Sequence, residues 1–213
     1  MRNVRPTYKG RRRRQKGGCG GCLGKLLILI FVFVVVGFLG YKAFQGFGIR
    51  NRILQTRYPI RYQTEVEKYA EEFQLEPALV YAVIRTESGF DPYAVSSAGA
   101  KGLMQLKEET AFDCVRALKI NHFTVDDLFD PAVNIRLGCY YFSKLLKTYD
   151  GCIETAAAAY NGGPGNVEKW LQDEALVDEK GKLTKVPFAE TRNYVENIVE
   201  SYQMYQKLYT NAE

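Results

Sequence analysis

The sequence contains one histidine, His122, among its 213 residues. A single histidine cannot form a multi-histidine metal centre, and a Ser-His-Asp triad would depend on this one side chain, which lies in a polar stretch. Strand-like alternation is also missing, so a glycine-rich phosphate loop that follows a strand has no place to form. We therefore expect His122 at the surface, no bound metal and no other cofactor.

Acidic residues are absent before Glu65. Of the 29 basic side chains, 14 precede Tyr62, and nine of these fall within residues 1–25. The remaining 15 basic residues are outnumbered by 24 acidic ones, so the chain from Tyr62 onward is negatively charged. Because a nucleic-acid groove needs a positive surface, we expect no nucleic-acid partner.

A run of sixteen uncharged residues, LLILIFVFVVVGFLGY, occupies positions 26–41 between Lys25 and Lys42. It is slightly shorter than the roughly 20 apolar residues of a usual membrane span, but flanking lysines can reach past the apolar layer. A cleaved signal peptide would carry a small-x-small site after the run, and a core helix would not follow a polybasic segment. The run therefore predicts a transmembrane signal anchor.

The excess of Lys and Arg before this anchor predicts its orientation, with residues 1–25 forming a basic cytoplasmic tail. Residues 42–63 contain glycines and no sustained hydrophobic period, so we predict a linker there. It would connect the cell membrane to a domain formed by residues 64–213. That domain would lie outside the cytoplasm.

Five cysteines divide between the two sides of this predicted membrane segment. Cys19 and Cys22, in GGCGGCLG, form a single CxxC pair, for which metal binding, a glycine hinge and acylation remain alternatives. Cys114, Cys139 and Cys152 belong to the domain on the oxidising side, where one disulfide could form and leave one thiol over. The sequence favours no pairing among these three.

Hydrophobic periodicity in the domain is helical throughout, which predicts an all-α fold. Thr64 suits the N-cap of the first helix, and Pro77, Pro131 and Pro164 suit first helical positions. Residues 172–187 are charged and weakly patterned, so we expect a loop or a small hairpin. The predicted helices cover residues 64–73, 77–88, 103–118, 131–149, 154–160, 164–171 and 191–208.

Glu87 falls in the last turn of the helix that begins at Pro77, on the same apolar face as Val80 and Val83. The helix cannot continue past Pro92, so the carboxyl lies near the negative end of the helix dipole. Desolvation and this dipole both disfavour the ionised form, which raises the pKa and suits a general acid. The alternative is a helix-end glutamate with its carboxyl in solvent.

Four sequence blocks resemble the catalytic domain of the soluble lytic transglycosylases, which belong to the goose-type-lysozyme-like group. They are ESGFDPYAVSSAGAKGLMQL at 87–106, LFDPAVNIRLGCYY at 128–141, AYNGGPGNV at 159–167 and ETRNYV at 190–195. The resemblance implies a lysozyme-like helical domain with one catalytic acid/base, Glu87. It also implies a set of substrate-binding residues: Ser96, Met104, Gln105, Tyr160, Asn161 and Tyr194.

Each polar member of this set also has an ordinary structural interpretation. Ser96 could be a turn residue, Gln105 a helix cap, Tyr160 a core residue and Asn161 a helix C-cap. One departure from the family pattern is Lys107, because members commonly continue GLMQ with a hydrophobic residue, Met and Pro. Glu108 departs in the same way, and an altered contact at a sugar subsite is the effect we expect from the two residues, while the acid is unchanged.

The resemblance implies cleavage of the β-1,4 bond between N-acetylmuramic acid and N-acetylglucosamine in peptidoglycan glycan strands. Glu87 would protonate the glycosidic oxygen and then accept a proton from the sugar's own 6-hydroxyl, which closes a 1,6-anhydro ring. The substrate's acetamido group would replace the second carboxylate of ordinary glycosidases. Two alternatives stay open: a muramidase that uses water, and a non-catalytic wall-binding scaffold of an envelope-spanning machine.

Overall fold

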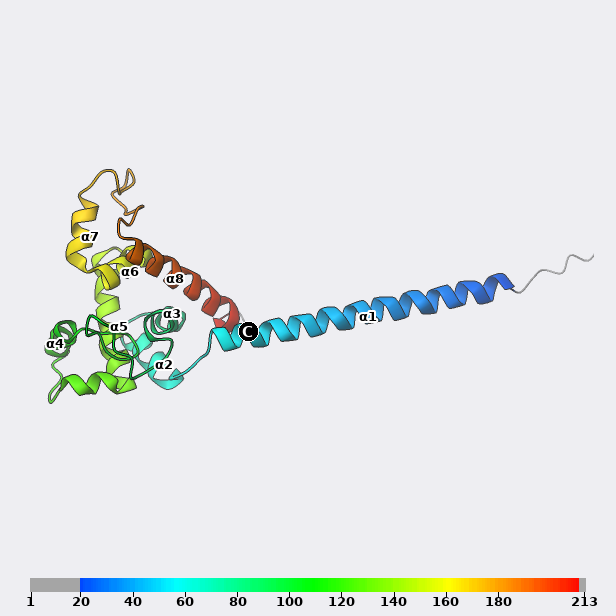
Figure 1. Cartoon of the computed structure of the whole chain (residues 1–213), viewed down its shortest axis with the longest axis horizontal. Helices are drawn as coiled ribbons and strands as arrows, with labels where there is room; N and C mark the ends of the chain where they lie inside the picture. The colour runs from blue at the N-terminus through cyan, green and yellow to red at the C-terminus, as the bar shows by residue number, and fades with distance from the viewer. Residues whose placement is uncertain (1–19, 211–213) are drawn as a thin grey trace, which may run out of the picture. The chain divides into compact units, whose positions relative to one another are not determined.

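The computed structural model describes residues 20–210, so the basic tail before residue 20 and Cys19 lie outside the described residues. The chain divides into two compact units, Met1–Ile53 and Leu54–Glu213, each of which is described by itself. Figure 1 shows the helices of both. The second unit contains every residue that the sequence nominates for catalysis or substrate binding.

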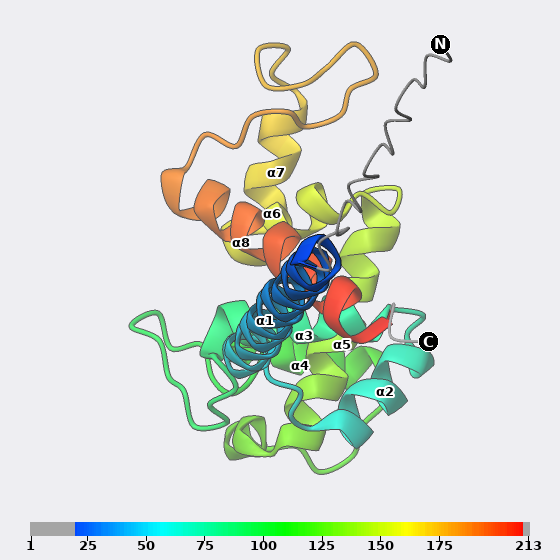
Figure 2. The same ribbon diagram turned by 90° about the vertical axis from the view of Figure 1, so that its right-hand side faces the viewer.

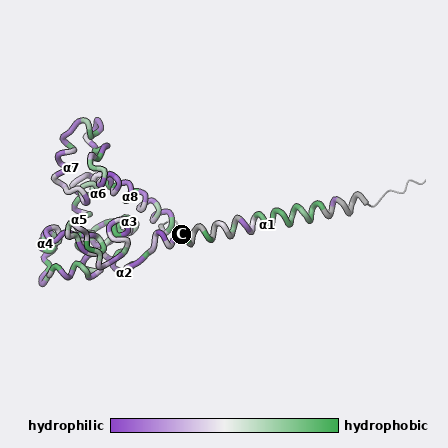
Figure 3. The backbone as a smooth tube through the Cα atoms, in the orientation of Figure 1, coloured by the Kyte–Doolittle hydropathy of each residue, from purple (hydrophilic) through white to green (hydrophobic). Residues whose placement is uncertain are grey.

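The first helix, α1 (Gly20–Arg57), is continuous through most of the segment predicted to be a linker. Large apolar side chains between Ile28 and Leu39 are exposed, from 37% at Val35 to 84% at Phe33. They form the hydrophobic band on this helix in Figure 3. Across residues 20–210, we find no helix that is both long enough and apolar enough to cross a membrane.

The second unit is built from helices, and its described part contains isolated β-bridges but no strand. The all-α prediction is therefore confirmed. The elements are α2 (Gln63–Glu72), α3 (Pro77–Ser88), α4 (Glu108–Ala117), the 3-10 helix η1 (Val125–Phe129), α5 (Pro131–Thr148), α6 (Ile153–Gly162), α7 (Pro164–Leu171), α8 (Ala189–Tyr205) and the π-helical turn η2 (Gln206–Thr210).

Helix α3 forms the centre of the core, because every residue from Ala78 to Ile84 is buried. It packs against α8, which also contacts α6, and both views of the molecule show these helices side by side (Figures 1 and 2). The alanines from Ala156 to Ala159 on α6 are fully buried. Their small side chains let α5, α7 and α8 approach α6 closely.

Helix starts agree with the sequence where a proline or a capping side chain defines them. Pro77, Pro131 and Pro164 each occupy the first positions of their helices. Asp130 caps α5, since its Oδ1 accepts hydrogen bonds from the backbone nitrogens of Ala132 and Val133 at 2.8 and 3.0 Å.

Two helix starts differ from the prediction. The N-cap of α2 is Tyr62, in the left-handed conformation, and not Thr64. The predicted helix at 103–118 begins at Glu108, because Gly102 and Gln105 adopt positive φ angles of 76° and 46°. The apolar residues before Glu108 are buried as expected, but they lie in a tight turn.

The three cysteines of the domain are free thiols, so the disulfide that three thiols would permit is not formed. Cys114 and Cys139 are buried in the core, and Cys152 is half-buried at the start of α6. Burial raises the pKa of Cys114 to about 12. His122 is exposed, as predicted, in a left-handed turn with φ of 62°.

Candidate active site

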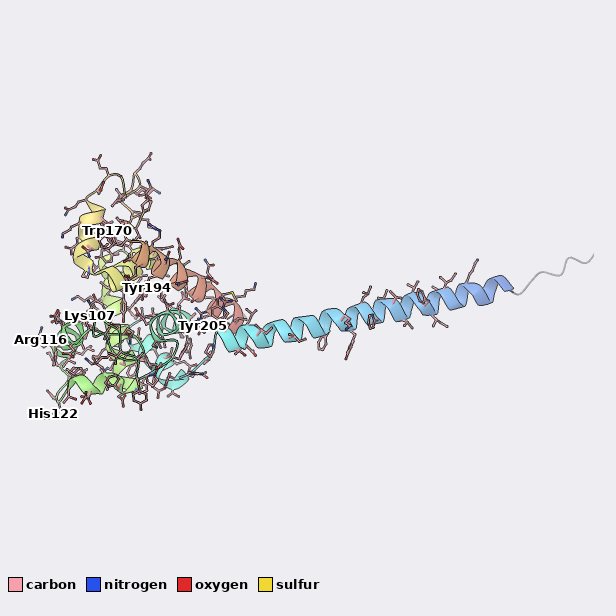
Figure 4. All side chains as sticks on the ribbon, in the orientation of Figure 1. Lys107, Arg116, His122, Trp170, Tyr194 and Tyr205 are labelled. Carbon is pink, nitrogen blue, oxygen red and sulfur yellow. The ribbon has the colours of Figure 1, made fainter. Side chains whose placement is uncertain are left out.

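A cleft of about 550 Å³ opens beside the last turn of α3. Its walls come from the loop before α4, from the middle of α5, from the α6–α7 junction and from the first turn of α8. Figure 4 labels Lys107 on the α4 side and Tyr194 on α8. The polar residues that line the cleft are Glu87, Ser96, Ser97, Gln105, Lys107, Thr110, Tyr141, Tyr160, Asn161 and Glu190.

Glu87 lines this cleft from a half-buried position in the last turn of α3. Burial removes water from the carboxyl and raises its pKa from 4.5 to about 7. The hydroxyl of Tyr194 donates a hydrogen bond of 2.7 Å to Oε1, which lowers the pKa and partly offsets the burial. A substantial fraction of Glu87 therefore keeps its proton near neutral pH, as a general acid requires.

Tyr194 is buried on α8 and stays protonated, because its own pKa is raised well above the usual value by burial and by the neighbouring carboxyl. It can therefore only donate to Glu87, and this bond fixes the orientation of the carboxyl. The sequence prediction placed Tyr194 among the substrate-binding residues. The structure places it behind the acid, outside the set of residues that line the cleft.

Asn134 on α5 holds the turn that carries Met104 and Gln105. Its side chain is fully buried, and its Oδ1 accepts a hydrogen bond from the Met104 nitrogen at 2.7 Å. Its Nδ2 donates to the carbonyls of Lys101 and Leu128 at 3.0 and 2.8 Å. The Lys101 carbonyl also accepts from the Leu106 nitrogen, whereas the Met104 nitrogen and the Leu128 carbonyl would lose their buried partner without Asn134. Asn134 therefore sets the shape of the turn.

Two glycines allow this close approach between α5 and the turn. A Cβ atom on Gly102 would overlap the Asn134 side chain and the Leu128 carbonyl, and Gly102 also needs its positive φ. A Cβ on Gly138 would overlap the side chain of Met104. The glycines are therefore required by packing as well as by turn geometry.

The same turn is tied to α3 and α6. Ser88, directly after the acid, donates from Oγ to the Leu103 carbonyl at 2.8 Å. Tyr160 donates from its hydroxyl to the Met104 carbonyl at 2.7 Å. These bonds connect α3, which carries Glu87, to the end of α6 through one turn. The cleft walls are therefore positioned relative to each other before any ligand binds.

Met104, predicted to bind substrate, lies in the core. Its side chain is fully buried against Gly138, and it is not among the residues that line the cleft. Its backbone nitrogen and carbonyl are used by Asn134 and Tyr160. Met104 thus contributes to the site by fixing the turn from inside the core.

Ser96 and Gln105 do line the cleft, and both also stabilise its loop. The Oγ of Ser96 accepts a hydrogen bond from the Ala100 nitrogen at 3.0 Å, so the turn-residue interpretation is correct, and substrate binding by Ser96 stays a prediction. Gln105 is not a helix cap, because its Nε2 donates to the carbonyls of Ala94 and Gly102 at 3.0 and 2.9 Å. These bonds leave its Oε1 as a possible acceptor for a ligand.

Tyr160 and Asn161 reach the cleft from the end of α6. The ring of Tyr160 is 5.3 Å from that of Tyr141 between centroids, so core packing and a place in the cleft coexist. Burial and the nearby Glu87 raise the pKa of Tyr160 well above its usual value, which keeps it a hydrogen-bond donor. The side chain of Asn161 is exposed to the cleft.

Sequence reasoning did not assign Tyr141, Asn134 or Glu190 to the site. Asn134 and Tyr141 lie in the block at 128–141, and Glu190 opens the block at 190–195, so all three were within matched segments. Asn134 is a polar residue on the buried face of α5, and this unusual position was the sequence signal for a structural role. The position of Glu190 in the cleft depends on how α8 packs, which the local sequence does not indicate.

Comparison with known proteins gives a consistent result. Residues 65–181 match the family model described as the transglycosylase SLT domain. The soluble lytic murein transglycosylase of Escherichia coli K12 is 32% identical over 158 residues, which are 73% of this chain and 24% of that protein. The membrane-bound lytic murein transglycosylase C of Yersinia enterocolitica is 32% identical in an alignment 168 residues long, which covers 69% of this chain and 47% of that protein.

Solved structures agree at the level of the fold. An inactive mutant of the lytic transglycosylase Slt from Pseudomonas aeruginosa superposes with a TM-score of 0.68 at 34% identity. That match covers 75% of this chain and 26% of the other. The chain thus spans about a quarter of the length of its soluble relatives. Because the family model covers more than half of the sequence, this chain belongs to the transglycosylase SLT domain family.

Proposed function

We propose that this chain is a peptidoglycan lytic transglycosylase that cleaves the β-1,4 bond between N-acetylmuramic acid and N-acetylglucosamine and leaves a 1,6-anhydro-muramic end. The observation that carries the proposal is the carboxyl of Glu87, which lines an open cleft with a pKa raised to about 7. Family membership and the names of the relatives support the substrate class.

In the first step Glu87 donates its proton to the glycosidic oxygen, and the bond between that oxygen and C1 of the muramic residue breaks. The substrate's acetamido carbonyl stabilises the positive charge at C1. Ser96, Gln105 and Asn161 are proposed to hold the sugars, since each presents a polar group on the cleft wall. Tyr194 keeps the acid oriented throughout.

In the second step the same carboxylate, now ionised, removes the proton from the 6-hydroxyl of the muramic residue. The 6-oxygen attacks C1, the anhydro ring closes, and Glu87 regains its proton for the next cycle. Ionised Glu87 is disfavoured by its buried position and supported by the Tyr194 hydroxyl, so this carboxyl can serve both as acid and as base.

A muramidase is the second candidate, and the observation that favours it is Glu190. This exposed carboxyl lies in the same cleft, where it could activate a water molecule in the manner of the second carboxylate of a hydrolase. Mass spectrometry of the muropeptides released from purified peptidoglycan separates the two candidates. Anhydro ends are expected from a transglycosylase, and reducing muramic ends would identify a muramidase.

The digest is best done with residues 50–213, wild type beside Glu87→Gln. We expect the substitution to abolish release of muropeptides while peptidoglycan binding persists. If wild type releases no muropeptides although the protein binds glycan strands, the chain is a wall-binding scaffold and the catalytic proposal fails.

We further propose that residues 26–41 anchor the domain in the cell membrane, with residues 1–25 in the cytoplasm and residues 42–63 as a linker. The exposed apolar side chains between Ile28 and Leu39 support a lipid environment, and Lys25 and Lys42 bound them. Relatives named membrane-bound support membrane association.

Fractionation of cells that express the full chain tests this anchor. We expect the protein in the membrane pellet after an alkaline carbonate wash, and the chain from residue 50 onward in the soluble fraction. Release of the full chain by carbonate would show that residues 26–41 do not span the membrane. Protease added outside spheroplasts should remove the domain and leave a tagged N-terminus protected.

A further inference from the structure

Lys107 is the one cation among the described residues that line the cleft. It directly precedes α4 with an extended backbone, at φ −72° and ψ 149°, and follows the buried Leu106. Its backbone is thus fixed by the core, while its side chain is exposed. The ammonium group can reach a ligand in the cleft without moving the fold.

The neighbouring charges leave Lys107 available. Glu108, the next residue, is bonded to the ammonium of Lys101 at 2.6 Å. Glu109 is exposed, and neither it nor Glu108 lines the cleft. None of the ion pairs formed within the described residues includes Lys107. A negative group bound in the cleft therefore meets a lysine with no competing carboxylate at hydrogen-bonding distance.

In the substrate of the proposed function, the negative charge along the sugars is confined to the muramic residues. N-acetylglucosamine is neutral, whereas each muramic residue carries a lactyl ether whose carboxyl is either free or amide-linked to a stem peptide. Stem peptides carry carboxylates of their own. A cation in a glycan cleft is therefore complementary to the muramic residue and to nothing else on the strand.

We propose that Lys107 selects glycan strands by forming an ion pair with a carboxylate borne by a muramic residue. This inference rests on the proposed function and concerns specificity within the same cleft. The remaining charged-type residues of the cleft, Glu87 and Glu190, are acidic and offer no positive charge, so recognition of a carboxylate depends on Lys107. The two sources of the carboxylate, lactyl group and stem peptide, share this chemistry and are separated by experiment.

The experiment compares two pairs of strand preparations. Within each pair, one preparation has free carboxylates and the other has the same carboxylates converted to amides. One pair carries stem peptides, and the other has been stripped of peptides by an amidase. On at least one pair, we expect wild type to show a KM about fivefold lower for the carboxylate form, with a difference that shrinks as salt is added. Lys107→Met should remove this difference with kcat unchanged, and Lys107→Arg should retain it.

Lys169→Met is the matched control, because Lys169 is exposed on α7 and does not line the cleft. It should behave as wild type. A preference confined to the stripped pair identifies the lactyl carboxylate, and one confined to the other pair identifies the stem peptide. Equal KM values of wild type for the carboxylate and amide forms of both pairs would overturn the proposal. An equal rise in KM on all four preparations in Lys107→Met would overturn it as well.

Binding measurements keep this test independent of catalysis. The same four strand preparations are titrated into Glu87→Gln and into Glu87→Gln combined with Lys107→Met. If wild type releases no product from any strand, the proposed function fails. A Lys107-dependent preference for carboxylates in binding would still stand, and its absence would remove the specificity proposal separately.

Discussion

Two glutamates line the same cleft from opposite kinds of helix end. Glu87 lies in the last turn of α3, half-buried, whereas Glu190 lies in the first turn of α8 and is exposed. A helix C-terminus disfavours negative charge, and a helix N-terminus favours it. Burial acts in the same direction at Glu87, where the pKa is raised to about 7. The comparison teaches that burial at a helix C-terminus, and not residue type, raises the pKa at Glu87.

The largest expected effect comes from neutralising each carboxyl in turn. Glu87→Gln should lower kcat by about 1,000-fold, since general acid catalysis typically contributes 100- to 10,000-fold. Glu190→Gln should change kcat by less than about fivefold, because in the proposed mechanism both proton transfers are made by Glu87. Muropeptide release measured for both variants checks this. A larger loss in Glu190→Gln would reverse the assignment of roles.

Removing the Asn134 side chain, which holds the turn that carries Met104 and Gln105, should have the next largest effect. Asn134→Ala leaves the Met104 nitrogen and the Leu128 carbonyl without their partner, and it removes one of the two hydrogen bonds to the Lys101 carbonyl. We therefore expect a loss of roughly 3 kcal/mol in the free energy of unfolding. The exposed Asn193 on α8 supplies the control, and Asn193→Ala should stay within about 0.5 kcal/mol of wild type. Urea denaturation measures both, and equal stabilities would show that the turn does not need Asn134.

The stability of the domain should also depend on the proton of Glu87. The folded state holds this proton up to about pH 7, whereas the unfolded chain releases it near pH 4.5. The resulting stabilisation is complete below pH 4.5 and is lost as pH rises through about 7, with an upper limit of roughly 3 kcal/mol. Subtracting the profile of Glu87→Gln from that of wild type isolates this contribution. A difference that grows with pH would contradict the burial argument.

The smallest effect is expected at Tyr194, whose hydrogen bond lowers the pKa of Glu87. Tyr194→Phe should therefore raise that pKa further and move the alkaline fall of kcat to higher pH. We expect kcat at pH 6 to change by only a few fold, because the carboxyl remains in the cleft. A shift of the alkaline fall to lower pH would mean that the hydroxyl does not stabilise the ionised form.

The sequence predicted those parts of the fold that depend on local chemistry. Prolines at first helical positions located α3, α5 and α7, and the apolar face of α3 placed Glu87 at the core boundary. The segment at 103–106 was predicted as helix, since its apolar residues fit either structure. It forms a turn because Ser88, Asn134 and Tyr160, which are distant in sequence, bond its backbone groups.

The candidate site was predicted less completely than the fold. Ser96, Gln105, Tyr160 and Asn161 do meet Glu87 around one cleft. The roles of Met104 and Tyr194 could not be resolved from motifs, because a matched residue can act from inside the core as well as from the surface. Side-chain direction at these positions is decided by tertiary packing.

Direct titration of Glu87 tests the central claim. The carboxyl carbon of selectively labelled glutamate can be followed by NMR from pH 3 to 9 in the domain from residue 50 onward, with Glu87→Gln used to assign the signal. We predict a midpoint near pH 7 for Glu87. A midpoint near 4.5, the ordinary value for a glutamate, would show that the carboxyl is solvated and is not the acid of this cleft.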